Sequence, residues 1–77
     1  MINKAIGLFF KIERERFGFT QGQVSTHLRL NSSSAMSNLE LGKREWTYCE
    51  VVEALAFFGV SNSSFEAFID MARGMSK

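Results

Sequence analysis

The amino-acid sequence predicts an all-α protein, a compact five-helix bundle that contains a helix-turn-helix. Apolar residues recur every three or four positions through most of the chain, as they do on the buried face of a helix. No run longer than five residues alternates apolar and polar side chains, so no half-buried strand is expected. At three of the expected helix starts a Ser or Thr is followed three residues later by Glu or Gln, which is the capping box that opens a helix. The length fits a single domain over residues 1–77.

The first helix is expected from about Asn3 to Phe17. Ile6, Phe10 and Phe17 lie on one stripe that would face the core, and Gly18 would end the helix. Three apolar side chains lie off this stripe: Leu8, Phe9 and Ile12. We expect some of them to pack the first helix against the fifth and the rest to form an apolar patch.

The second helix is predicted to begin after Thr20. Thr20 and Gln23 form a capping box, in which the hydroxyl accepts a backbone N–H and the glutamine side chain reaches back. Val24 and Leu28, four residues apart, would face inward.

The third helix lies within the segment LNSSSAMSNLELGKREW, residues 30–46. Ser32 is a favourable N-cap and Gly42 a favourable residue at the C-terminal end. Met36 and Leu39 would face inward, which leaves a small polar face outside. The short connection to the second helix predicts a helix-turn-helix.

Two further capping boxes predict the last two helices. The first, TYCE at residues 47–50, opens a helix that ends at Gly59, and the second, SSFE, opens a helix over about 63–74. The fourth helix would turn one apolar face inward: Tyr48, Val51, Leu55 and Phe58. The fifth, the expected packing and dimerisation element, would do so with Phe65, Phe68, Ile69 and Ala72.

Composition argues against several classes of protein. Cys49 is the single cysteine, which excludes a disulfide within the chain, and one His with one Cys cannot form a protein-only structural zinc site. No nucleophile with a base, metal cluster or phosphate-binding glycine loop is found, so no enzyme activity, cofactor or small-molecule ligand is expected. The apolar run Ala5–Phe10 is too short to span a membrane and lacks a cleavage site, which favours a cytoplasmic protein.

Charge is divided unevenly along the chain. Residues 1–49 carry seven basic and four acidic side chains, a net charge of +3, whereas residues 50–77 carry a net charge of −2. A basic front and an acidic back would suit a polyanion on one side only.

The segments GFTQGQVSTHL and MSNLELGKR together resemble the helix-turn-helix domain shared by phage repressors, Cro proteins and the wider Xre-type family. The matching positions are Gly18 to Gln21 and Leu39 to Arg44, and the resemblance extends from Ile6 to Ser61. It implies a lambda-repressor-like fold that binds DNA. It also implies an ion pair between Arg14 and Glu40, which would hold the third helix on the first.

The sequence departs from the family pattern in the turn before the third helix. This turn is one residue longer, and Arg29 stands where glycine is usual. We expect the chain to turn at Asn31 instead, since asparagine tolerates a left-handed backbone. Ser25 stands where alanine is customary, and its hydroxyl can bond back to a carbonyl.

The third helix is expected to read DNA, because a helix enters the major groove when its outer face is narrow and can form hydrogen bonds. Asparagine pairs with adenine, and serine donates or accepts at several bases. The base-reading candidates are Ser33, Ser34, Ser37 and Asn38. The longer turn leaves the rotation of this helix open.

Affinity is expected to come from contacts with phosphates. Candidate residues flank the third helix and carry a positive charge or a hydrogen-bond donor. They are Thr20, Gln21, Arg29, Lys43 and Arg44.

These features predict a sequence-specific transcription regulator, a repressor that binds double-stranded DNA at a near-palindromic operator as a homodimer. The candidate interface residues are Trp46, Phe57, Phe68, Met71 and Met75. Trp46, which stands where proline is common in the family, fits the core equally well. The alternative is a protein-interaction module of the antitoxin or adaptor kind on the same fold.

Overall fold

The computed structural model describes residues 2–75, with side chains through residue 74, and contains five α-helices in this range. They are α1 (Ile2–Phe17), α2 (Gln21–His27), α3 (Ser33–Leu41), α4 (Tyr48–Phe58) and α5 (Asn62–Met75). No strand occurs among these residues, so the predicted all-α bundle is confirmed. The radius of gyration is 11.6 Å, close to the value of about 11.5 Å for a folded chain of this length.

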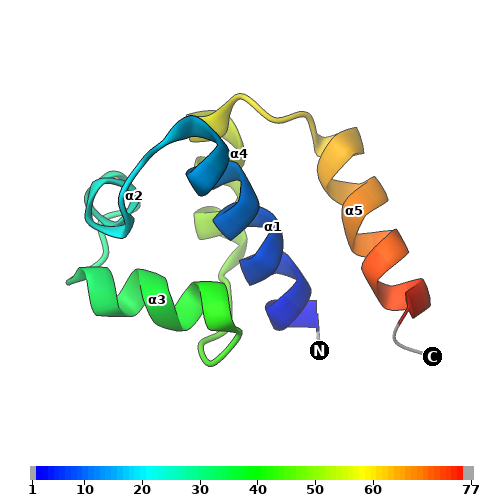
Figure 1. Ribbon diagram of the computed structural model, residues 1–77, viewed down its shortest axis with the longest axis horizontal. Helices are drawn as coiled ribbons and strands as arrows, with labels where there is room; N and C mark the ends of the chain where they lie inside the picture. The colour runs from blue at the N-terminus through cyan, green and yellow to red at the C-terminus, as the bar shows by residue number, and fades with distance from the viewer. Residues whose placement is uncertain (1, 76–77) are drawn as a thin grey trace.

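Helix α1 lies in the middle of the bundle (Figure 1). Helix α3 crosses the N-terminal half of α1, and α2 packs against α3. Helix α4 lies behind α1 in this view, and α5 packs chiefly on α1 at the other side of the molecule. The α3 helix, on which α2 packs, and the C-terminal helix are therefore held by the same central helix.

The caps set most helix boundaries as predicted. Two of the three expected capping boxes are present, at Thr20 and Thr47, and the Ser32 hydroxyl accepts the backbone N–H of Ala35. A glycine with a left-handed backbone follows three of the helices, at Gly18, Gly42 and Gly59.

The capping box expected at residues 63–66 is wrong. The capping residue of α5 lies two positions earlier, at Ser61, whose hydroxyl accepts the backbone N–H of Ser64 at 3.1 Å, and the helix begins at Asn62. Serine caps well at either position, so spacing alone could not choose between them. Three residues predicted to face inward do so: Ile69 is buried, and Phe65 and Phe68 pack against the core.

Phe10 is the centre of an aromatic core. Its ring lies 4.8 Å from that of Trp46, 6.2 Å from Phe58 and 5.6 Å from Phe65, measured between centroids. The sequence allows Trp46 to be a core residue or an interface residue, and the structure places it in the core, at 8% exposure. One side chain thus joins α1, α4, α5 and the loop after α3.

Phe9 is buried against Phe65 and Phe68 because α5 covers that side of α1, so one of the off-stripe side chains packs against α5 as expected. Two apolar side chains lie elsewhere than predicted. Phe17 is half-exposed at the end of α1, although its ring still stacks on Phe58. Tyr48, in the first turn of α4, faces solvent. Periodicity orders the positions of a helix but does not say how far a neighbouring helix extends.

Gly7 permits the contact between α1 and α3. A Cβ at Gly7 would collide with the backbone oxygen of Leu39 and lie 2.6 Å from that of Glu40. Only glycine allows the two backbones to approach this closely.

Gly7→Ala is expected to lower the free energy of unfolding by about 1–3 kcal/mol, because its methyl group would meet two backbone carbonyls. Gly74→Ala is the matched control: it lies in α5, and nothing is within 4 Å of the added Cβ. Since alanine is the better helix former, this control should not destabilise the protein. Urea unfolding measures both, and equal losses of stability would contradict the proposed role of Gly7.

Candidate nucleic-acid interface

Helices α2 and α3 form the unit in which the sequence predicts DNA contacts. In Figure 1, α2 is seen almost end-on while α3 lies across the view, so the two axes cross steeply. Val24 and Leu28 of α2 and Met36 and Leu39 of α3 are buried, as predicted. These apolar faces hold the pair on the core.

The turn between α2 and α3 is made at Arg29, which has a φ of 61°. The prediction that Asn31 takes the left-handed conformation is therefore wrong. The chain turns directly after Leu28, where Arg29 N–H and Leu30 N–H bond back to Thr26 and Ser25 carbonyls. The extra residue thus comes after the turn and does not move it.

Ser25 ties the two helices together. Its hydroxyl donates to the Ser32 carbonyl at 2.8 Å, across the turn. The hydroxyl therefore bonds forward to the next helix and not back to a carbonyl as the sequence suggested, and it fixes the backbone of the residue that caps α3. The start of α3 is consequently held by α2.

Glu40 is the centre of a buried polar network between three helices. Its carboxylate accepts from Arg14 Nε at 2.6 Å and Nη2 at 3.2 Å, and from Gln21 Nε2 at 3.0 Å. The Glu40 side chain is 2% exposed and that of Arg14 12%. The ion pair implied by the resemblance is present, with a bidentate geometry that fixes orientation as well as distance.

The C-terminal end of α3 is held by Trp46, a role that the sequence did not reveal. The indole Nε1 donates to the Leu39 carbonyl at 3.1 Å, and the backbone N–H of Trp46 donates to Asn3 Oδ1 at 3.0 Å. Trp46 is therefore not available as an interface residue. No rule of residue spacing predicts such a contact for a single tryptophan that follows a glycine turn.

The outer face of α3 carries the predicted base-reading residues. Ser33, Ser34 and Asn38 are exposed and Ser37 is half-buried. Hydrogen bonds from these four side chains to other residues in 2–75 are absent. The nearby side chains of Gln21, Ser25 and Thr26, by contrast, all bond within the fold.

Leu41 adds an apolar side chain to this otherwise polar face. It is 52% exposed and stands three residues after Asn38, in the last turn of α3. An apolar side chain on a groove-reading helix can contact a thymine methyl group.

The five candidate phosphate contacts divide into two groups. Three are already used within the protein: Thr20 caps α2, Gln21 donates to Glu40, and Arg44 pairs with Glu50 at 3.0 Å. Arg29 and Lys43 are exposed and have no ion-pair partner among residues 2–75. One of the two N–H donors of the Gln21 side chain is thus already bonded to the carboxylate of Glu40.

The remaining dimer candidates do not form one exposed patch. The ring of Phe57 packs between His27 and Phe19, at centroid distances of 4.3 and 5.0 Å. Phe68 packs on Phe9, whereas Met71 is 57% exposed. The side chain of Met75 lies outside the described residues.

Other kinds of site receive no support from the part of the chain that the structure describes. Residues 2–75 contain no group of three His, Cys, Asp or Glu side chains placed to hold a metal ion. None of the helices in this range combines the length and apolar character that a membrane crossing requires. Comparisons with protein-family models, curated proteins and solved structures gave no match.

Arg14→Ala is expected to cost about 3–5 kcal/mol of stability, because it would leave the buried carboxylate of Glu40 without its cation. Lys4→Ala is the control on the same helix. The Lys4 side chain is exposed and has no ion-pair partner among residues 2–75, so its loss should cost less than about 1 kcal/mol. Chemical denaturation of both variants measures the difference, and similar costs would contradict the role given to the Arg14–Glu40 pair.

Arg29→Gly is expected to raise stability by up to about 1 kcal/mol, because glycine adopts a left-handed backbone without steric cost. Arg29→Ala removes the same charge but keeps the strained Cβ, so it should bring no such gain. Thermal unfolding of the two variants compares them. If both changed stability by the same amount, the charge and not the backbone would be responsible.

Proposed function

We propose that this protein is a DNA-binding regulator that inserts α3 into the major groove. The observation that carries the proposal is the contrast between the two faces of α3. Its inner face is bonded to the fold through Glu40 and Leu39, while the polar side chains of its outer face have no partner among residues 2–75. A fixed helix with free donors and acceptors is suited to reading base edges.

Small side chains favour a close approach of α3 to the bases. The major groove is about 12 Å wide and admits an α-helix. Ser33 and Ser34 project little, and Asn38 can pair in a bidentate manner with adenine N6 and N7. Because α3 is held at both ends, little conformational freedom would be lost on binding.

Phosphate contacts in this proposal come first from Lys43 and Arg29, the two candidate cations that have no ion-pair partner among residues 2–75. Arg44 would join them only by exchanging Glu50 for a phosphate. Because only these two candidate cations are unpaired, sequence-independent affinity should be modest, and a larger share of binding would depend on the bases.

A protein-interaction module is the second candidate function. It is favoured by the net charge of only +1 and by an open apolar groove between α4 and α5. The two functions differ in their response to salt, because DNA binding releases counterions and weakens steeply as salt rises. A failure to bind any duplex at low salt would exclude the first proposal.

Asn38→Ala is expected to weaken binding to a specific site by about 1–3 kcal/mol and to change binding to random DNA little. Lys43→Ala should weaken both alike and reduce the salt slope by about 1. The specific site would come from selection of bound sequences out of a random DNA pool, followed by titration at several salt concentrations. If Asn38→Ala weakened binding to the specific site and to random DNA equally, as Lys43→Ala is expected to do, the assignment of Asn38 as the base reader would be wrong.

A further inference from the structure

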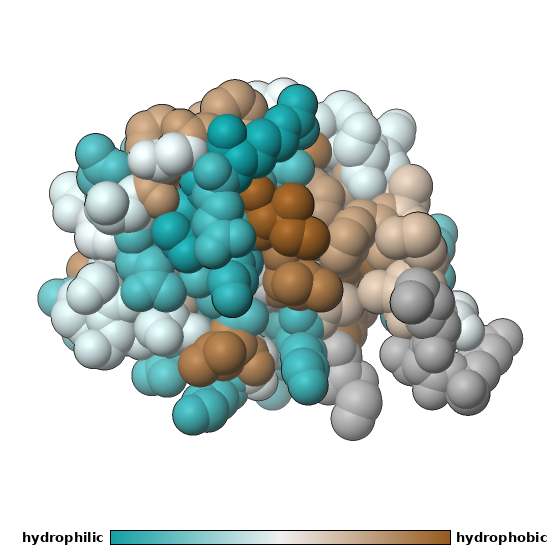
Figure 2. All heavy atoms as spheres, viewed as in Figure 1, coloured by the Kyte–Doolittle hydropathy of each residue, from teal (hydrophilic) through white to brown (hydrophobic). Residues whose placement is uncertain are grey.

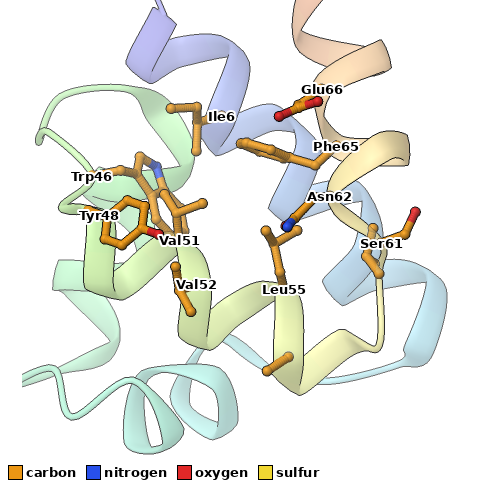
Figure 3. Close-up of a pocket in the computed structure, with 12 residues that line it drawn as sticks. Ile6, Trp46, Tyr48, Val51, Val52, Leu55, Ser61, Asn62, Phe65 and Glu66 are labelled. Carbon is orange, nitrogen blue, oxygen red and sulfur yellow. The ribbon is translucent and has the colours of Figure 1, made fainter.

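An apolar groove of about 740 Å³ runs between α4 and α5. Side chains of α4 form one wall and side chains of α5 the other, as Figure 3 shows. On the α4 wall, Tyr48 is 82% exposed and Val52 45%. A second hollow of about 300 Å³ shares Ile6, Phe65 and Glu66 with the groove, so the two are continuous along α5.

The rim of this groove is mainly acidic. Glu66 lines both hollows and Asp70 lines the second, and neither has an ion-pair partner among residues 2–75. One cation, Arg73, lies at the far end of the second hollow. An occupant that matches this surface would be apolar in the middle and basic at its margin.

The outer face of α1 has this character. Leu8 and Ile12, four residues apart on one side of the helix, are 48% and 44% exposed. Lys4 and Lys11 flank them and have no ion-pair partner within the described range. Figure 2 shows apolar surface gathered over α1 and continuing toward α5. Neither Leu8 nor Ile12 lines the groove, so α1 presents a separate surface.

We propose that the outer face of α1 in one copy of the chain docks into the α4–α5 groove of a second copy. Leu8 and Ile12 would pack against Tyr48 and Val52, as an amphipathic helix packs into a groove. Lys11 would approach the acidic rim at Glu66. Each molecule carries both complementary surfaces, which is why the occupant is a second copy of this chain.

The contact joins two different surfaces and is therefore heterologous. Neither surface includes a residue of α3. Self-association and DNA binding consequently rest on separate parts of the molecule, and the test of one does not depend on the other.

The test is complementation between two variants in sedimentation velocity, without DNA. The wild-type chain should show an average mass that rises above 8.7 kDa as its concentration increases. Ile12→Glu spoils only the α1 face and Val52→Glu only the groove, so each variant alone should remain monomeric. An equimolar mixture should form dimers, because the intact groove of the first variant can receive the intact α1 face of the second.

Three results would overturn the proposal: a monomeric wild type at all concentrations, self-association of either variant at the wild-type level, or a mixture that stays monomeric. Circular dichroism and thermal unfolding verify that both variants are folded, as expected for exposed helical positions. Ile12→Ser and Val52→Ser provide a second pair for the same mixing experiment if a glutamate variant is unstable.

Discussion

Helix α3 can lie against α1 only because Gly7 leaves room for the backbone carbonyls of its last turn. This close approach brings Glu40 under the guanidinium of Arg14 and places the Leu39 carbonyl within reach of the Trp46 indole. The loop after α3 is tied back to the start of α1 through Asn3. The contact between α1 and α3 thus positions the core tryptophan, the polar network and the candidate reading helix together.

The polar network between α1 and α3 fixes the orientation of the helices more than it stabilises the fold. A buried ion pair gains little over an apolar contact, because both charges lose their hydration. Its bidentate geometry, however, allows only one relative placement of α1 and α3. Gln21 extends the same constraint to α2. The rotation of α3 is therefore set by bonds on its inner face, and this decides which side chains face outward.

Aromatic residues are more numerous than a chain of this size can bury around one centre. Phe10 collects rings from several elements, and α5 covers Phe9. Because α5 packs chiefly on α1, a groove remains between α5 and α4, and apolar side chains stay exposed on both α1 and α4. Small domains bury a limited share of their surface, and exposed apolar patches mark interaction sites.

Local signals in the sequence determined the helices and most of their ends. Caps at Thr20, Ser32 and Thr47 act within three residues, so spacing alone reveals them. The same holds for the inward positions of Met36 and Leu39, which follow from helical periodicity. The Arg14–Glu40 pair followed only from the family resemblance, since 26 positions separate its members.

Tertiary structure alone decided the rest of the candidate site. The left-handed backbone at Arg29, the contact at Gly7 and the bond from Trp46 to α3 each depend on how helices meet, and no local pattern encodes that meeting. The same reason explains why Gln21 and Arg44, which look free in the sequence, are occupied by Glu40 and Glu50. The sequence determines the chemistry of a side chain, but whether that side chain can bind a partner depends on which neighbours the fold places against it.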